Sequence, residues 1–338
     1  MDRLLEDLTR RRLDRRAFVA LLGLGALASS PEARAQQAGR LPVVGLLNSG
    51  SGPRSSLGDI VLESLRQLGY VEGKTIAFVF HFARGKPEAF PGLAADLVRR
   101  KVDVILVSGP PGVRAARDAT STIPIVALDL ESDPVQAGFA RSVARPGGNL
   151  TGCFLDQPGL TGKWLELIGE VVSGPRRLAV LVDTTTGPWQ LAAIKTAAEQ
   201  RRIELQVIEI GSAADLDRVL DAGLKGGPRA LVQLSSPLFD VPRAKRIAEF
   251  TLKNRLPAIS MFRRFPEAGG LMSYGPDQPQ YYKRLAFYID KILKGAKPGD
   301  LPIEQPTKFD FVINLKTAKS LGLALTQSFV SGADQVIQ

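Results

Sequence analysis

Short segments that are apolar throughout alternate with amphipathic segments along most of the chain. The first apolar segment, residues 42–47, has no polar side chain, which is typical of a strand buried on both faces of a parallel sheet. The next segment repeats apolar residues at helical spacing, and five of them share one side: Ile60, Val61, Leu62, Leu65 and Leu68. Further strands are predicted at residues 75–82, 102–107 and 124–128, and further helices at residues 88–100, 113–119 and 134–143. This alternation predicts parallel sheets with right-handed crossovers.

The second half of the chain repeats the first half in the same order. Residues 46–53 and 181–188 both pass from an apolar strand end through Asn or Asp and a hydroxyl-rich loop to Gly-Pro. Two further pairs of segments match: residues 104–108 with 230–235, and residues 123–126 with 256–259. Strands of the second half are predicted at residues 178–182, 205–210, 230–234 and 257–260. Three matches in one order indicate a duplication into two similar α/β lobes.

The two halves meet at residues 145–152, which contain three glycines and a proline. We expect no helix interior and no regular strand here, because proline removes a donor and glycine opens conformations closed to other residues. The segment is either a long surface turn or a crossover between domains. The repeats on either side favour the crossover.

Several motifs resemble one protein family. They are residues 145–152, 256–259, 267–277, 292–298, 306–309 and 312–318. The family is the substrate-binding proteins of ABC importers, whose better-known members bind tryptophan and related aromatic amino acids. The resemblance runs from about residue 41 to the C-terminus. It implies an α/β fold of type I periplasmic-binding-protein architecture, in which two Rossmann-like lobes with parallel sheets hold the ligand in the cleft between them.

The family's path implies three interlobe crossovers and therefore discontinuous lobes. Residues 36–150 plus 275–300 are expected to form lobe one, and residues 151–274 plus 301–338 lobe two. Gly- and Pro-rich clusters fall where the path needs its later crossings, at residues 269–270, 275–276 and 298–307. A short strand at residues 271–274, a helix at 280–293, a strand at 309–313 and a helix at 315–321 are predicted around them.

Residues 1–35 have the composition of an export signal rather than of a folded segment. Basic residues precede an apolar run at residues 18–28 that is too short to span a membrane. Small residues at the end of the segment predict cleavage before Gln36. Arg15-Arg16 fits a twin-arginine signal, with ordinary secretion as the alternative. The mature protein is therefore expected in the periplasm without a lipid anchor, because no cysteine stands at the cleavage site.

Cysteine, histidine and charge narrow the possible functions. The single cysteine, Cys153, excludes an intramolecular disulfide, and the single histidine, His81, excludes a histidine-built metal site. His81 lies in a predicted strand and is interpreted as an ordinary strand histidine rather than a catalytic one. The formal charge of +10 is spread over the chain, which favours a solvated basic surface over a nucleic-acid interface. No helix-turn-helix pattern precedes the first lobe.

Polar residues that follow the predicted strands form the candidate ligand site, since binding residues of parallel sheets gather at the carboxyl ends of strands. One wall of the cleft is expected to contain Asn48, Ser49, Ser51, Ser108, Gly109 and Asp129. The other wall is expected to contain Asp183, Thr184 and Ser235, with Tyr274 and Asp277 near the hinge. Hydroxyls and N–H groups at helix starts suit a carboxylate, and an acid suits an ammonium. Each polar residue could instead serve only as a helix cap.

Roles within this set follow in part from the resemblance. Asp277 matches the acid of the family's Ser-Tyr-Gly-Pro-Asp motif and is the first choice for a ligand ammonium, with Asp183 and Asp129 as alternates. Three aromatic residues could stack on a ligand: Phe262, Trp189 and Tyr274. Arg263 or Arg264 would suit an anionic ligand instead. Asp129 and Glu131 depart from the small or apolar residues of the family pattern, so the ligand need not be tryptophan.

The sequence thus predicts an extracytoplasmic substrate-binding protein of an ABC importer that closes on a small polar or amino-acid-like ligand. No catalytic residues, metal or cofactor are expected. The expected partners are an ABC permease with its ATPase, while nucleic acid and stable membrane insertion are not expected, and the protein is predicted to be a monomer. The alternatives are a ligand sensor domain of a signalling system and, less favoured, an α/β enzyme. The enzyme lacks support because the chain has no nucleophile elbow, Walker loop or dinucleotide fingerprint.

Overall fold

The computed structural model describes residues 40–50, 56–174, 176–239 and 241–338. Residues 42–338 form one compact unit, and all the elements discussed below belong to it. The predicted export signal and the candidate ligand residue Ser51 lie outside the described residues.

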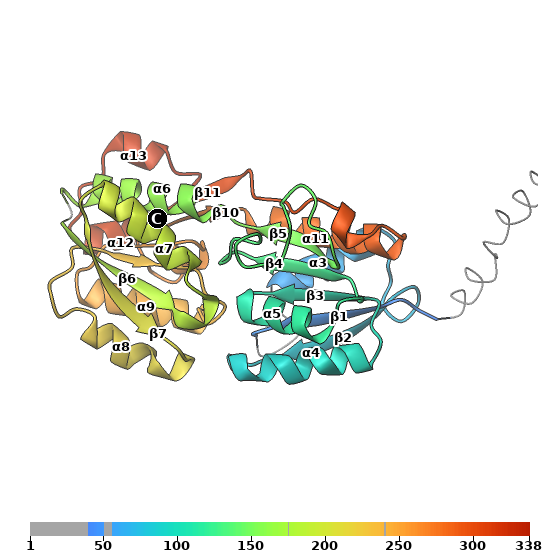
Figure 1. Ribbon diagram of the computed structural model, residues 1–338. Coiled ribbons are helices and arrows are strands. Elements are labelled where there is room, and N and C mark those ends of the chain that lie inside the picture. Colours follow the sequence, from blue (N-terminus) through green and yellow to red (C-terminus); the bar gives the residue numbers. More distant parts are fainter. Residues whose placement is uncertain (1–39, 51–55, 175, 240) are drawn as a thin grey trace, which may run out of the picture. The chain divides into compact units, whose positions relative to one another are not determined.

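The strands of the first half of the chain form a five-stranded sheet (Figure 1). Its strands are β1 (Val43–Asn48), β2 (Ala77–Phe82), β3 (Val104–Ser108), β4 (Ile125–Asp129) and β5 (Leu150–Phe154). They are ordered β2-β1-β3-β4-β5, and all four pairings are parallel. Uniformly apolar strands form such a sheet because helices cover both of its faces. The predicted strand positions and the parallel pairing are confirmed.

Helices pack on both faces of the five-stranded sheet, and their apolar sides form two separate cores. Helices α3 (Ser56–Gln67) and α11 (Gln278–Leu293) cover one face. Helices α4 (Phe90–Arg99) and α5 (Pro110–Ala119) cover the other. The ring of His81, on β2, lies 2.7 Å from Asp96 Oδ2 on α4, so this histidine joins a strand to its covering helix. Leu68, predicted on the buried side of the first helix, is 47% exposed because α3 ends at Gln67.

The predicted helix at residues 134–143 is wrong. The segment forms a series of turns, in which the backbone N–H groups of Phe139 and Ala140 both donate to the carbonyl of Pro134. Gly138 has a φ of 72°, a left-handed conformation that interrupts any α-helix. The apolar spacing that suggested a helix therefore reflects side chains of a compact turn.

A seven-stranded sheet contains most of the second half, in the order β12-β11-β10-β9-β8-β6-β7. Its strands are β6 (Arg177–Asp183), β7 (Glu204–Ile210), β8 (Leu231–Gln233), β9 (Ala258–Ser260), β10 (Met272–Pro276), β11 (Phe309–Asn314) and β12 (Gln335–Ile337). The strands pair in parallel except for β10 and β11, which are antiparallel. After β10 the chain forms α11 on the five-stranded sheet, and it then re-enters the seven-stranded sheet as β11 in the opposite direction.

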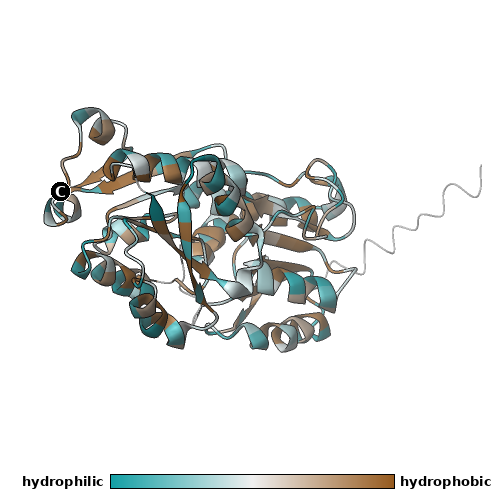
Figure 2. Cartoon of the chain, turned by 60° about the vertical axis from the view of Figure 1, so that its left-hand side comes forward, coloured by the Kyte–Doolittle hydropathy of each residue, from teal (hydrophilic) through white to brown (hydrophobic). Residues whose placement is uncertain are grey.

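The seven-stranded sheet is also covered on both faces. Helices α6 (Gln157–Val171) and α7 (Trp189–Gln200) pack on one face, and α8 (Leu216–Ala222) and α9 (Val241–Lys253) on the other. The short helices are α10 (Arg264–Glu267), α12 (Leu315–Ser320) and α13 (Gln327–Ser331). Figure 2 shows apolar colours along the strands and polar colours on outward parts of the helices. Two α/β lobes with their own sheets are thus confirmed.

The segment at residues 145–152 contains a turn followed by the start of a strand, which corrects the sequence interpretation. Gly147 and Gly148 have positive φ and form the turn. Gly152 lies within β5, where a Cβ would be only 2.0 Å from the carbonyl oxygen of Ala127. Glycine is needed here because strand β4 approaches closely, and the chain leaves the first sheet only after Phe154.

The same pairing shifts the predicted lobe boundaries. Residues 151–154 belong to the five-stranded sheet with β4, although they were assigned to lobe two. Glu304 pairs with Cys153, and its backbone N–H donates to the carbonyl of Gly152, so this part of the segment at 301–308 also follows the first sheet. Residues 275 and 276, assigned to lobe one, still belong to β10.

Candidate functional site

A cavity of about 170 Å³ lies at the carboxyl ends of the strands of both sheets. On the first lobe it is lined by residues that end or follow β1, β3 and β4, together with two residues of α11 and one of α3. On the second lobe it is lined by the loops after β8 and β9. The lining residues are Asn48, Ser49, Gly50, Leu57, Ser108, Gly109, Leu128, Leu130, Glu131, Ser236, Pro237, Phe262, Arg264, Gln278 and Tyr282. This is the place where ligands bind in open α/β sheets.

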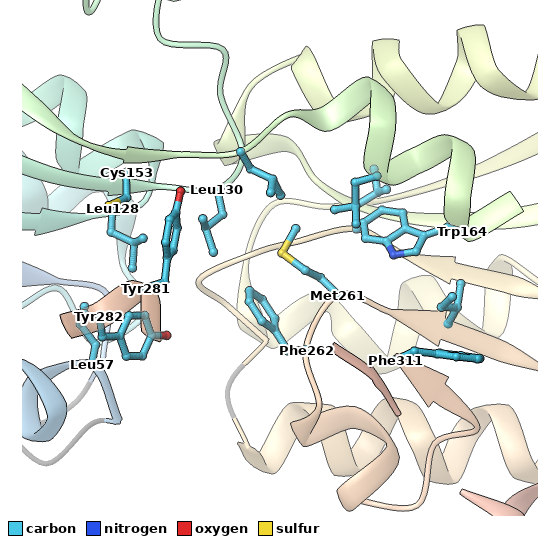
Figure 3. Close-up of a cluster of buried hydrophobic side chains, with 14 of the residues drawn as sticks. Leu57, Leu128, Leu130, Cys153, Trp164, Met261, Phe262, Tyr281, Tyr282 and Phe311 are labelled. Atoms are coloured by element: carbon cyan, nitrogen blue, oxygen red, sulfur yellow. The ribbon is translucent and has the colours of Figure 1, made fainter. Parts of the chain in front are cut away.

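One part of the cavity wall is apolar and comes from both lobes. Leu128 and Leu130 belong to the first lobe, and Tyr282 and Leu57 lie beside them on α11 and α3 (Figure 3). Phe262 approaches from the second lobe in the same view. Such a wall suits a flat or branched apolar group of a ligand.

The polar part of the cavity begins at the ends of β1 and β3. Asn48 is buried, and its Oδ1 accepts a hydrogen bond of 2.8 Å from the backbone N–H of Gly50. Gly109 has a φ of 78°, and a Cβ at this position would lie 2.7 Å from the Cγ of Pro237. A glycine at 109 therefore allows the second lobe to come close to the first.

Helix α5 offers fewer N–H donors to a carboxylate than the sequence analysis supposed. Its first two residues are Pro110 and Pro111, and proline has no backbone N–H. The N–H of Gly109 is already donated to the carbonyl of Leu128. The start of α5 therefore offers no N–H from Pro110 or Pro111 to a ligand carboxylate.

Glu131 is a buried acid that the sequence analysis noted but did not select. It is 5% exposed and lines the cavity. Its Oε1 accepts a hydrogen bond from the hydroxyl of Ser235, which belongs to the second lobe. Burial raises the pKa of Glu131 above its ordinary value, and the nearby carboxyl of Asp129 raises that pKa further. The buried carboxyl thus links the two lobes at the cavity wall.

Asp129, a predicted ligand residue, lies behind the cavity wall rather than in it. Side chains alternate along a strand, and the neighbours on either side, Leu128 and Leu130, line the cavity while Asp129 does not. Its Oδ1 accepts hydrogen bonds from the backbone N–H groups of Glu131, at 3.0 Å, and Ser132, at 2.9 Å. Burial raises its pKa despite these hydrogen bonds.

Asp183 and Thr184 are held by contacts within the second lobe. Asp183 Oδ1 accepts hydrogen bonds from the N–H and the hydroxyl of Thr185 at 2.8 and 2.7 Å. Its Oδ2 accepts one of 2.6 Å from Ser236 Oγ. The hydroxyl of Thr184 donates to the carbonyl of Ile210 at 3.3 Å. Asp183 therefore caps its loop, which is the alternative role considered for such residues.

Ser49 and Ser235 are the predicted hydroxyls that contact the opposite lobe. Ser49 Oγ donates to the carbonyl of Pro237 at 3.3 Å. Ser235 is buried, and its backbone N–H donates to Gln190 Oε1 at 2.8 Å while its hydroxyl reaches Glu131. Ser49 lines the cavity, whereas Ser235 lies behind Glu131.

The two predicted hinge residues lie outside the cavity lining. Tyr274 stacks on Phe309 with ring centroids 5.6 Å apart. Asp277 caps helix α11 by accepting a hydrogen bond of 3.2 Å from the N–H of Gln280, and its Oδ2 lies 3.0 Å from Lys308 Nζ. Asp277 lines a different cavity of about 330 Å³, formed by α11 and residues 304–308. The proposed pairing of Asp277 with a ligand ammonium therefore has no support in the position of this side chain.

The cavity lining also contains residues outside the selected ligand set, among them Glu131, Phe262, Arg264, Gln278 and Tyr282. Phe262 had been considered only for stacking, and Arg264 only for an anionic ligand. The guanidinium carbon of Arg264 lies 4.1 Å from the ring centroid of Phe262, so a cation and an aromatic ring share this side of the cavity. Gln278 Nε2 donates to the hydroxyl of Tyr282 at 2.9 Å. The sequence indicated Arg264 as a candidate, because two arginines stand beside an aromatic residue there. It did not indicate Tyr282, because the spacing of Tyr282 in its helix is that of a core residue.

Trp189, considered for stacking, lines another cavity of about 390 Å³. That cavity lies between α7, the turns at residues 133–136 and the crossover residues 155, 156, 158 and 305.

Within the described part of the chain, no group of three or more His, Cys, Asp or Glu side chains could hold a metal ion. No helix among the described residues is long and apolar enough to cross a membrane.

Two α/β lobes with a cavity at their strand ends define a bilobed ligand-binding protein of the type I periplasmic class. The chain belongs to the family of ABC transporter substrate binding proteins, whose family model matches residues 54–337. Both the family and the fold that the motifs suggested are thereby confirmed.

Individual relatives agree with this assignment. A tyrosine-binding protein of Clostridioides difficile (strain R20291) is 24% identical over 268 residues, which cover 78% of this chain and 75% of that protein. An ABC domain from Streptococcus pneumonia, solved in complex with L-Trp, has a TM-score of 0.80 at 22% identity and covers 88% of this chain and 100% of its own. A conserved domain protein of Vibrio cholerae has a TM-score of 0.81 at 24% identity, with the same coverage. These structures share the fold with this chain.

Proposed function

We propose that this protein is the extracytoplasmic binding component of an ABC importer and that it closes on a small amino acid with an apolar or aromatic side chain. The cavity between the lobes is the observation that carries this proposal, because strand ends of both sheets contribute to its lining. A cavity of about 170 Å³ lies below the roughly 300–1,000 Å³ of pockets for drug-sized ligands. It therefore suits a small metabolite.

The chemistry of the wall matches the parts of an amino acid. Glu131 supplies an acid for an ammonium, and Arg264 supplies a guanidinium for a carboxylate. The apolar wall of Leu128, Leu130 and Tyr282 supplies contact area for a side chain. Relatives that bind tyrosine or contain L-Trp support the same ligand class.

Contacts between the lobes support closure around the ligand. Ser49 Oγ donates to the carbonyl of Pro237, and Arg114 Nη2 donates to the carbonyl of Thr185 at 2.8 Å. These hydrogen bonds break when the lobes separate and form when they approach, as in the hinge closure of binding proteins. The proposal includes ligand binding and release and no catalytic step.

The proposal includes export and transport partners. Export through residues 1–35 would deliver the protein to the periplasm, where it would pass its ligand to a permease with its ATPase. A sensor that reports ligand to a signalling partner would use the same lobes. Transport of the ligand that depends on this protein in cells distinguishes the importer from the sensor.

Thermal unfolding with the twenty common L-amino acids tests the ligand class. A binder present at 100 times its Kd stabilises the protein by about 2.7 kcal/mol, so a binding amino acid raises the midpoint of unfolding. The variant Ser108→Phe fills the cavity and should abolish the increase. Ala193→Phe places the same ring in the cavity beside Trp189 and should preserve it. If Ala193→Phe removes the increase while Ser108→Phe keeps it, the ligand site lies beside Trp189 instead.

A further inference from the structure

We propose that Glu131 determines the specificity of the cavity by selecting ligands that carry a protonated amine, and that Glu131 releases its own proton when the ammonium binds. This inference rests on the proposed function and deepens it by naming the group that recognises one end of the ligand.

The position of Glu131 is the first argument. Glu131 lines the cavity and is only 5% exposed, so its carboxyl is largely removed from water. Its hydrogen bond comes from the neutral hydroxyl of Ser235, and no lysine or arginine of the described residues forms a salt bridge with it. A buried carboxylate without a cation is costly. An ammonium group of a ligand would supply the cation that the carboxylate of Glu131 lacks.

The charged groups around Glu131 make ionisation of its carboxyl still less favourable in the ligand-free protein. The titratable and charged groups that face this region are Asp129 at the end of β4, Asp183 at the end of β6, Arg114 on α5, and Arg264 and Tyr282 on the cavity wall. Asp129 and Asp183 both disfavour a negative charge on Glu131. Arg114 acts on Asp129 and donates a hydrogen bond to the carbonyl of Thr185.

An acceptor without a donor lies next to Glu131. Asp129 is fully buried behind the wall, where its Oδ2 and the nearby hydroxyl of Ser132 both lack a hydrogen bond among the described residues. Burial raises the pKa of both carboxyls, in line with the shortage of cations. Of these two acids Glu131 lines the cavity, and an ammonium with three N–H donors and a positive charge complements its carboxyl.

The proton balance of binding follows directly. In the ligand-free protein the carboxyl of Glu131 keeps its proton below the raised pKa. An arriving ammonium stabilises the carboxylate, the O–H bond of the carboxyl breaks, and its proton passes to buffer. The ammonium keeps all its protons, so one ligand bound releases up to one proton. A ligand without an amine provides no such compensation.

Matched pairs of probes test the selection. Each L-amino acid that stabilises the wild-type protein is compared by calorimetry with its deaminated carboxylic acid, for example L-phenylalanine with 3-phenylpropionate. Wild type should bind the amino acid more tightly by roughly 30-fold to several thousand-fold. Glu131→Gln keeps the shape of the side chain and an acceptor for Ser235, and it should lose most of that preference. Asp277→Asn alters a carboxyl outside the cavity and should bind like wild type.

Proton release provides a readout that a structural role of Glu131 would not change. Titrations at pH 6.5 in phosphate and in imidazole, buffers of different ionisation enthalpy, should show proton release by wild type and none by Glu131→Gln. Equal affinity of the amino acid for wild type and Glu131→Gln would overturn the inference. Tight binding of deaminated acids by wild type would overturn it too, while leaving ligand binding in the cavity intact. If neither amino acids nor deaminated acids bind, the proposed function fails as well.

Discussion

Replacing Glu131 by Gln should change how the stability of the ligand-free protein depends on pH. Glu131 holds a proton more tightly in the folded protein than in the unfolded chain, because burial raises its pKa. The free energy of unfolding therefore falls as pH rises from the ordinary glutamate pKa, about 4.3, through the raised pKa of the folded state. Below that window the folded and unfolded states both hold the proton, and the contribution is fully present.

The size of the effect follows from one proton. A single proton that is bound in the folded state but not in the unfolded state changes the free energy of unfolding by about 1.4 kcal/mol per pH unit. Two pH units within the window thus cost about 2.7 kcal/mol, against a total stability of roughly 5–15 kcal/mol. Glu131→Gln removes this titration, whereas Asp129 keeps the pKa increase that its own burial causes.

Urea unfolding of the ligand-free wild type and Glu131→Gln between pH 5 and 8 measures the difference directly. The variant should become progressively more stable relative to wild type as pH rises. Asp277→Asn is the control: burial alone raises the pKa of Asp277, but hydrogen bonds from Lys308 and from the N–H of Gln280 lower it overall. Its difference from wild type should stay constant, because that carboxyl is already ionised across this range. A constant difference between wild type and Glu131→Gln would refute the reasoning.

Two further predictions concern closure and export. Gly109→Ala places a Cβ 2.7 Å from the Cγ of Pro237 at a positive φ; small-angle scattering at saturating ligand should give a larger radius of gyration than for wild type. Gly138→Ala has a similar φ but nothing within 4 Å of the Cβ, so it should close like wild type, and equal behaviour of the two variants would contradict the role of this contact. Changing Arg15 and Arg16 to lysine should block export if the twin-arginine route is used; normal periplasmic delivery would leave ordinary secretion.

The strands could be predicted because buried parallel strands carry their own signature. Segments such as residues 43–47 are apolar on both faces, and this pattern depends on the strand alone rather than on its partners. The antiparallel pairing of β10 with β11 could not be read in this way, since it follows from the path of the chain between the lobes. Gly152 was misread for a similar reason: its requirement comes from Ala127 on the neighbouring strand.

The candidate site was predicted in part, at the residues that directly end strands. Asn48, Ser49, Ser108 and Gly109 all line the cavity, because the carboxyl ends of parallel strands share one edge of a sheet. Asp277 could not be placed by that rule, since a residue that follows a strand and begins a helix serves equally well as a cap. Tyr282 carries no signal at all, because a helix that packs on a sheet presents aromatic residues to the core and to the cavity at the same spacing.

The contact between Glu131 and Ser235 connects ligand charge with lobe closure. A protonated Glu131 and a neutral Ser235 form a hydrogen bond between neutral groups, which contributes about 0.5–1.5 kcal/mol. Once an ammonium favours the carboxylate, the same hydroxyl donates to an ionised acceptor, and such hydrogen bonds are roughly twice as strong. The closed arrangement of the lobes therefore gains stability from the same ionisation that the ligand causes. An uncharged analogue that fills the cavity would bind without strengthening this contact, so closure and selection for the amine depend on one carboxyl.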